Sequence, residues 1–388
     1  MPFWIGVSIG PRFFPAILLL SLWAVVSLME PLQKVRAVDW LVIALGLISV
    51  AYLALGTVEL PHVFNLLGWV IPYFLGRSTG YRVTRESLIL IFAVVGLLLS
   101  LQSLIEFSLD WHPFSTLTLA FGPSEIWSPI LYRSSFARSE GALGHPIALG
   151  LAIAICIPFV LATRLRARAR LALVSVMFAA VLVTFSRNAI IAALLSVVLS
   201  FFFLRELGRP AARVAVVVVL LGASVALAPT YLNSIDGGTG VLENSADYRL
   251  NFFSVIPNVG LFGISDIYTE YAPGKWGWAS SAYEEDVIVT LDNTILLDAL
   301  QFGSLHAAIL LFVLADIVRR FTRDRSNPAL LAIVAQIPAL LAVAMITQLP
   351  YLLWLIAGIG VSWAEQRDAN KGRSHSFAED SAPQMASR

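Results

Sequence analysis

The chain has 388 residues, of which 58% are hydrophobic and only 13% charged, and its mean hydropathy is +0.80. A soluble domain is about half apolar and a quarter charged, so this composition excludes a soluble globular protein and predicts an all-α, polytopic integral membrane protein. The net charge of +1 gives no indication of a nucleic-acid partner, since no basic run forms a face, and we expect none. The single cysteine, Cys156, lies in an apolar run, which excludes a disulfide framework and a cysteine-based metal site.

Windows of about 17–25 apolar residues mark candidate membrane spans. The chain contains eleven such windows, which predicts about 11 transmembrane helices. They lie near residues 13–29, 39–57, 62–77, 87–106, 147–163, 170–185, 188–204, 212–229, 294–318, 329–346 and 350–364. Residues 1–10 are apolar but too short to cross a bilayer alone, so we expect 12 spans in a full-length relative.

The distribution of basic residues predicts the orientation. Twenty of the 26 lysines and arginines, including Arg77, are assigned to one alternating set of loops and to the C-terminal tail. Cytoplasmic loops carry the excess of Lys and Arg, so loops 107–146 and 231–292 are expected to face outward. Residues 1–364 then form a single membrane domain, and the polar stretch 365–388 is expected to be a disordered cytoplasmic tail.

The outer loop 231–292 is the longest polar segment of the chain, and it connects two strongly apolar ones. It contains nine acidic residues and only two basic ones, Arg249 and Lys275. Connections of this length are uncommon without a function. We therefore expect this loop to contribute to the functional site.

Three arginines stand out on the expected outer face, where cations are few: Arg138, Arg187 and Arg249. Arg187 interrupts the apolar run 171–204, in the break Ser186–Asn188. An arginine there is costly unless it snorkels, pairs or binds an anion. Guanidinium groups match phosphate oxygens in geometry, so Arg187 is either a snorkelling turn residue or a phosphate clamp.

The neighbouring candidates also have a plain structural interpretation. Arg138 could pair with Glu140 or remain a solvated loop charge, and Arg249 could pair with the nearby Asp247. His145, which precedes Pro146, could begin a helix as its cap or be a hydrogen-bonded core histidine.

Asp292 and Asn293 lie where the outer loop meets the next apolar run. Either residue could cap the following helix. The functional alternative makes Asp292 a general base that accepts the proton of a hydroxyl. The acidic group at 284–286 lacks the spaced ligands of a metal site and is expected to be solvated.

Four elements, in this order, resemble those of the O-antigen ligase and O-antigen polymerase superfamily of bacterial membrane glycosyltransferases. They are Arg138-Ser-Glu-Gly141 with Gly144-His145-Pro146; Thr184-Phe-Ser-Arg187-Asn-Ala; Arg249 with Pro257-Asn-Val-Gly-Leu-Phe-Gly263; and Leu291-Asp-Asn293-Thr-Ile-Leu296 with Gly303. Asp292 stands where the ligase pattern has histidine, and this difference favours a polymerase-like member.

The resemblance implies a membrane-glycosyltransferase-type fold and an inverting, metal-independent transferase that needs no cofactor. Its donor would be a polyprenyl-diphosphate-linked glycan, such as one on undecaprenyl diphosphate, and its acceptor a glycan or glycolipid. It would act among membrane lipids, at the outer face of the bacterial inner membrane, in surface polysaccharide or lipopolysaccharide synthesis. Carried over to this chain, the residues acting in catalysis are Asp292, Arg187 and Arg249, and those binding substrate are Arg138, His145, Asn293 and Asp247.

Two other functions remain open from the sequence. A transporter or flippase of a lipid-linked glycan would place charges within spans and would have broken helices; Glu106, Asp298 and Asp316 are the few candidate charges, and each lies near a span end. A non-catalytic membrane scaffold is the third possibility, and the outer arginines argue against it.

Overall fold

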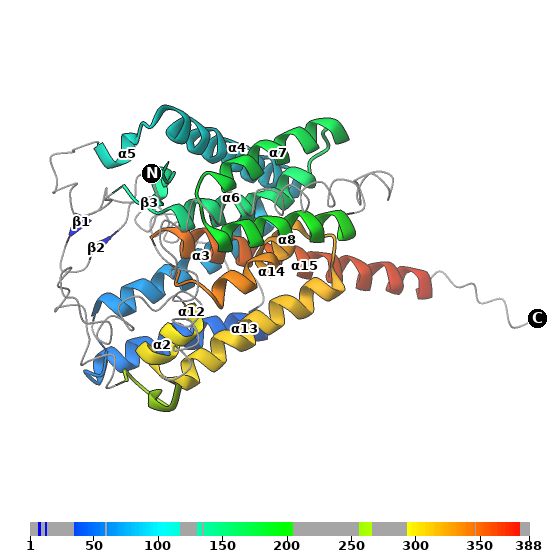
Figure 1. The fold of residues 1–388 in the computed structure, drawn as a ribbon. Coiled ribbons are helices and arrows are strands. Elements are labelled where there is room, and N and C mark those ends of the chain that lie inside the picture. Colours follow the sequence, from blue (N-terminus) through cyan, green and yellow to red (C-terminus); the bar gives the residue numbers. More distant parts are fainter. Residues whose placement is uncertain are drawn as a thin grey trace, which may run out of the picture.

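The computed structural model describes residues 7–8, 12–13, 35–58, 60–116, 130–133, 136–204, 256–265, 293–345 and 347–380. This part of the chain is mostly helical (Figure 1). Its helices are α2 (Ala37–Ala54), α3 (Leu60–Arg82), α4 (Arg85–Leu109), α5 (Pro113–Thr116), α6 (Pro146–Leu161), α7 (Ala167–Leu182), α8 (Arg187–Phe203), α12 (Thr294–Phe302), α13 (Ser304–Arg323), α14 (Pro328–Leu340) and α15 (Leu349–Asp380), with a 3₁₀ turn, η2, at Gly141–Leu143. Two short antiparallel ladders pair β1 (Val7–Ser8) with β2 (Arg12–Phe13) and β3 (Tyr132–Arg133) with β4 (Phe136–Ala137).

The helices form one bundle in which α6 lies at the centre. It packs against α4, α7, α8 and α14, and nearly all of its residues are buried. On the other side of the bundle α3 and α15 lie side by side, flanked by α2 and α13, while α14 contacts both groups. Figure 1 shows α15 projecting beyond the other helices toward the C-terminus.

Polar caps set where several of these helices begin. The side chains of Thr84, Ser186, Asn293 and Asn327 each accept a backbone N–H in the first turn of α4, α8, α12 and α14, respectively. Such caps satisfy backbone donors that have no partner within the helix. Of these helices, α12 and α14 bury most of their residues within the bundle, whereas α4 and α8 bury fewer than half.

The contact between α3 and α15 depends on glycines. A Cβ on Gly76 would lie 2.0 Å from the carbonyl oxygen of Leu355, and one on Gly358 would lie 2.0 Å from that of Tyr73. The two backbones therefore touch directly. Gly76 and Gly80 form a G-x-x-x-G pair, the spacing that allows helices to approach this closely.

Most expected spans within the described residues correspond to one helix each, but one prediction was wrong. The run expected as a single span at 294–318 is two helices, α12 and α13, separated at Gly303. Gly303 has φ 90°, and a Cβ there would lie 2.6 Å from the Leu261 carbonyl oxygen, because residues 256–265 pack against the break. The spans expected near 13–29, apart from Phe13, and near 212–229 lie outside the described residues.

Two further expectations need correction. The tail 365–388 was expected to be disordered, but α15 continues as a helix to Asp380, and residues 381–388 lie outside the described residues. Arg77 was counted among the loop residues, but it lies within α3 and is 7% exposed. Arg77 and the start of this tail are linked directly, because Glu365 of α15 accepts a hydrogen bond from Arg77 at 2.9 Å.

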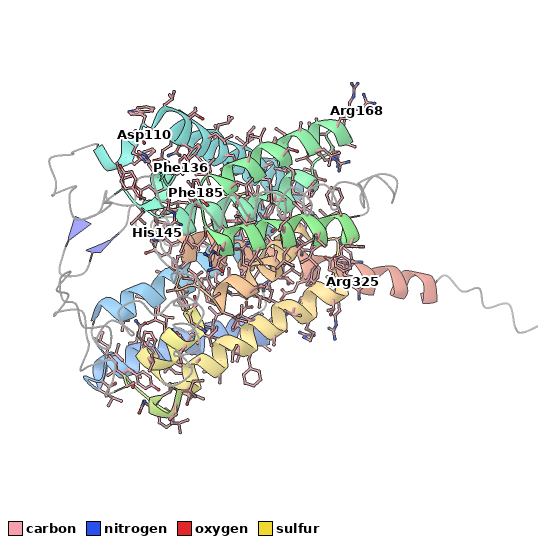
Figure 2. The ribbon with its side chains drawn as sticks, viewed as in Figure 1. Asp110, Phe136, His145, Arg168, Phe185 and Arg325 are labelled. Carbon is pink, nitrogen blue, oxygen red and sulfur yellow. The ribbon has the colours of Figure 1, made fainter. Side chains whose placement is uncertain are left out.

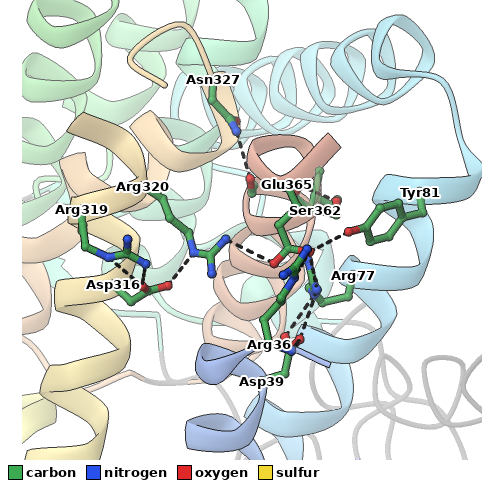
Figure 3. A network of polar contacts seen from close by, with 12 residues as sticks. Arg36, Asp39, Arg77, Tyr81, Asp316, Arg319, Arg320, Asn327, Ser362 and Glu365 are labelled. Carbon is green, nitrogen blue, oxygen red and sulfur yellow. Dashed lines mark hydrogen bonds and ion pairs between the residues drawn. The ribbon is translucent and has the colours of Figure 1, made fainter. Parts of the chain in front are cut away.

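These two residues belong to an ion-pair network at one end of the bundle (Figure 3). Arg77 Nη2 lies 3.1 Å from Asp39 Oδ2 of α2, while Arg320 of α13 bonds Glu365 Oε1 at 3.2 Å. Tyr81 donates to Glu365 at 2.7 Å. The network joins α2, α3, α13 and α15. We call this the arginine-rich end, and the opposite end the Arg187 end.

Two of the described helices, α2 and α4, are long and apolar enough to cross a membrane, and α6, α8 and α14 are shorter apolar helices. Figure 2 shows Arg168 and Arg325 at one end of the bundle and Asp110, Phe136, Phe185 and His145 toward the other.

Candidate functional site

The turn between α7 and α8 carries the first predicted site residue. The break lies over residues 183–186, one turn earlier than the expected Ser186–Asn188, so Arg187 is the first residue of α8. Phe185 in this turn has φ 50°, a conformation rare for a bulky side chain. Strained backbone of this kind is found preferentially at functional sites.

The position of Arg187 is electrostatically unfavourable in the absence of an anion. The N-terminus of a helix carries partial positive charge, which disfavours a cation there. The Nε of Arg187 is also buried and has no hydrogen-bond partner among the described residues. An anion at this helix end would accept a hydrogen bond from the guanidinium group of Arg187. It would also accept hydrogen bonds from backbone N–H groups of the first turn.

The segment that begins at Arg138 is fastened to this turn. Arg138 Nε donates to the Thr184 carbonyl oxygen at 2.9 Å, and the backbone N–H of Ser139 donates to Val183 at 3.3 Å. On the other side, buried Glu106 of α4 accepts the N–H of Gly141 at 2.9 Å. Arg138 is thereby held beside the turn that presents Arg187.

His145 acts as the cap of α6. Its Nδ1 accepts the backbone N–H of Ile147 at 3.1 Å, which matches the helix-cap interpretation of the sequence. Burial, and then the positive charge of Arg138, lower the pKa of His145 from 6.5 to about 4. His145 is thus neutral near pH 7, and its Nδ1 is committed to the helix start.

Asn293 and the residue after it bring the end of the long loop to the same region. Asn293 Oδ1 caps α12 by accepting the N–H of Leu296 at 3.0 Å. Thr294 Oγ1 donates to the Val343 carbonyl at 2.7 Å, and Asn188 of α8 reaches the adjacent Ala342 carbonyl at 3.4 Å. The starts of α8 and α12 therefore meet at the same two residues after α14.

An aromatic group lies next to the arginines. Phe136 stacks on Phe185, with ring centroids 5.8 Å apart (Figure 2). The ring centroid of Phe107 lies 5.9 Å from that of Phe185. Phe136 is 45% exposed. This end of the bundle thus combines guanidinium groups with an exposed apolar surface.

The structure brings together four of the seven predicted site residues: Arg138, His145, Arg187 and Asn293. The other three, Asp247, Arg249 and Asp292, lie outside the described residues. The Pro257–Gly263 element packs instead on the α12–α13 break, where the Gly260 carbonyl accepts the N–H of Ser304 at 2.9 Å.

Sequence reasoning missed a buried acid–imidazole pair in the same part of the bundle. Asp298 of α12 and His306 of α13 lie 2.8 Å apart, Oδ2 to Nδ1, and are 2% and 0% exposed. Asp298 had been considered only as a charge near a span end. The signal available was the presence of two ionisable residues eight positions apart in an otherwise apolar run.

Among the described residues, no group of three or more His, Cys, Asp or Glu side chains is placed to hold a metal ion. No protein-family model, curated protein or solved structure matches this chain. The site must therefore be interpreted from its own residues.

Proposed function

We propose that this chain is a polytopic membrane glycosyltransferase of the O-antigen ligase or polymerase type. It would transfer a glycan from a polyprenyl diphosphate to a glycan or glycolipid acceptor at the outer face of the bacterial inner membrane. The observation that carries the proposal is Arg187, a cation at a helix N-terminus whose buried Nε has no hydrogen-bond partner among the described residues. A diphosphate group would supply the negative charge and the acceptors that this position lacks.

A membrane location is supported by composition and packing. α2 and α4 have the length and hydropathy of membrane spans, and α3 and α15 approach through glycines as membrane helices do. The arginine-rich end would be cytoplasmic by the distribution of basic residues. The Arg187 end would then face outward, where lipid-linked glycans could enter sideways from the bilayer.

The chemistry requires no metal in this scheme. An acceptor hydroxyl attacks the anomeric carbon, the bond from that carbon to the diphosphate oxygen breaks with inversion, and the hydroxyl proton passes to a base. Arg187, with Arg249 and Arg138, would stabilise the negative charge that grows on the leaving diphosphate. Asp292 would accept the proton, and the exposed ring of Phe136 offers an apolar surface for the isoprenoid chain.

A transporter or flippase of a lipid-linked glycan is the second candidate. Two observations favour it: the buried Asp298–His306 pair and the broken helix at Gly303. Buried ionisable residues and interrupted helices are both common in transporters. The polar groups around Arg187 favour the transferase, because transport alone does not require a diphosphate clamp near a helix start.

The deciding experiment uses purified protein in lipid nanodiscs with a polyprenyl-diphosphate oligosaccharide and an acceptor glycan. We expect a new glycosidic product and stoichiometric release of polyprenyl diphosphate, both lost in Arg187→Ala. Movement of the intact lipid-linked glycan across proteoliposomes, without any covalent product, would instead establish the transporter.

A further inference from the structure

A cavity of about 210 Å³ lies between α3, α12 and the start of α15. Its lining includes Trp69, Thr294, Asp298, Gln301, Thr347 and Tyr351. Thr294 directly follows Asn293, so the cavity borders the site described above without sharing its arginines. Its volume is below the 300–1,000 Å³ or so of drug-sized pockets, which limits a ligand to about one ring.

Asp298 gives this cavity a buried acceptor. Its Oδ2 contacts His306 Nδ1, whereas its Oδ1 is buried and has no hydrogen-bond partner among the described residues. Leaving a buried carboxylate oxygen without a partner costs about 1–3 kcal/mol or more. A ligand that donates a hydrogen bond in the cavity would remove that cost.

The contacts of His306 determine which kind of donor suits Asp298. The hydroxyl of Ser49 donates to the Leu45 carbonyl at 3.0 Å. His306 Nε2, which lies 3.4 Å from Ser49 Oγ and 3.3 Å from that carbonyl, therefore faces two acceptors and carries a hydrogen. The 2.8 Å contact between Nδ1 and Oδ2 then holds one further proton, so the pair has no net charge. An acceptor in a neutral pair favours a hydroxyl over an ammonium group.

Thr347 adds a second polar atom without a partner. Its Oγ1 is buried and has no hydrogen-bond partner among the described residues. Its backbone has φ 55°, which is a marked outlier for a β-branched residue. Conformations of this kind cost about 1–3 kcal/mol and concentrate at ligand-binding positions.

Two aromatic rings complete the lining, and close packing fixes both. A Cβ on Gly68 would lie 2.3 Å from Cε1 of Tyr351, so this ring rests against the backbone of α3. Trp69 stacks on Trp354 with ring centroids 5.7 Å apart. The cavity thus combines rigid apolar rings with hydrogen-bond acceptors, the arrangement that suits a ligand with both an apolar face and hydroxyl groups.

We propose that this cavity binds one sugar unit, with Asp298 Oδ1 accepting a hydrogen bond from a sugar hydroxyl and Thr347 Oγ1 bonding a second. The proposal rests on the proposed function for the origin of the sugar, which would be a unit of the donor or acceptor glycan. Asp298 and Thr347 would then select the sugar, whereas Arg187 would contact the diphosphate.

The test measures binding of soluble methyl glycosides to the protein in nanodiscs by saturation-transfer NMR, with ethanolamine as a cationic probe. We expect at least one methyl glycoside to bind and ethanolamine not to bind. Asp298→Asn, whose amide oxygen is a neutral and weaker acceptor, and Thr347→Val, which removes the hydroxyl, should each weaken glycoside binding about 2- to 12-fold, as expected for a change of one neutral hydrogen bond. The matched controls Asp368→Asn and Thr322→Val, exposed residues at the arginine-rich end, should leave binding unchanged.

Failure of this inference can be separated from failure of the proposed function. Glycoside binding that depends on Asp298 or Thr347, in a protein without transferase activity, would retain the sugar site and remove the transferase. Transfer that depends on Arg187, with no glycoside bound or with binding unchanged in both cavity variants, would overturn the sugar site alone. If Asp298→Asn does not fold, the effect of Thr347→Val on glycoside binding decides whether the cavity is a sugar site. Preferential binding of ethanolamine over the glycosides would also overturn the sugar site.

Discussion

The two ends of the bundle use buried polar groups in opposite ways. At the arginine-rich end, Arg77 contacts the carboxylates of both Asp39 and Glu365, and Glu365 also bonds Arg320. At the Arg187 end, Arg187 Nε is buried and has no hydrogen-bond partner among the described residues. Removing one member of a buried ion pair exposes the other to the full cost of burial, whereas removing a group without a protein partner does not. The first end should thus govern stability, and the second should govern activity.

The largest effect is expected at Asp292, on activity alone. Asn293 provides the side-chain cap of α12, so the substitution Asp292→Asn should leave the folded protein intact. If Asp292 is the base, the transfer rate should fall about 10²–10⁴-fold, the usual contribution of a positioned acid–base group. Transfer assays at equal protein levels test this. Asp292→His, which restores the ligase-type residue, should retain partial activity.

The opposite end should respond through stability. Arg77→Leu leaves Asp39 and Glu365 buried without their shared cation, and this should lower the free energy of unfolding by about 3–5 kcal/mol. Denaturation of the protein in mild detergent measures the loss. Adding Asp39→Asn and Glu365→Gln to Arg77→Leu should recover part of it. A loss no greater than that of Arg187→Leu would remove the distinction between the two ends.

Arg187→Lys tests the geometry of the diphosphate contact. Lysine keeps the charge but not the planar fork, so transfer should fall about 10- to 150-fold, the equivalent of about 1.5–3 kcal/mol. The unfolding midpoint should stay near that of the wild type, because Arg187 forms no ion pair with the described residues. An unchanged transfer rate in both Arg187→Lys and Arg187→Ala would make Arg187 a snorkelling turn residue.

The smallest expected effect is the pH dependence at His145. The folded protein holds its pKa at about 4, below the ordinary 6.5, so the unfolded chain binds more protons between these values. The stability that comes from this cap is complete above pH 6.5 and is lost as the pH falls toward 4. His145→Asn supplies a cap that does not titrate, worth about 0.5–2 kcal/mol. Unfolding midpoints at pH 7 and pH 5 should therefore differ less in this variant than in the wild type.

The sequence predicted the starts of helices well where a polar capping residue precedes an apolar window, as Thr84 precedes α4 and Asn327 precedes α14. It did not predict the break at Gly303, because hydropathy continues through the glycine and the cause is a distant backbone segment at Leu261. Arg77 was misassigned for a similar reason: its partner Glu365 is 288 positions away. Tertiary contacts of this kind leave no local pattern in a single sequence.

The candidate site was predictable in part. The sequence elements allowed Arg138, His145, Arg187 and Asn293 to be assigned to one end of the bundle. In the structure, hydrogen bonds to the backbone carbonyls of Thr184, Ala342 and Val343 connect the segments that contain these residues. Asp298 and His306 were visible as two ionisable residues in an apolar run, but their contact could not be inferred, since it depends on how α12 and α13 pack. The strained Thr347 could not be inferred either, since it depends on a backbone angle.

One short segment, residues 260–265, forms backbone hydrogen bonds with both helices that meet at the Gly303 break. The N–H of Ser265 donates to Leu300 in α12 at 2.8 Å, while Ser304 and Leu305 of α13 donate to Gly260 and Leu261 at 2.9 and 3.3 Å. Residues 260–265 thus act as a strap across the joint. Any tilt of α12 must either stretch this strap or carry it along, so the position of Asp298 is mechanically coupled to the long loop.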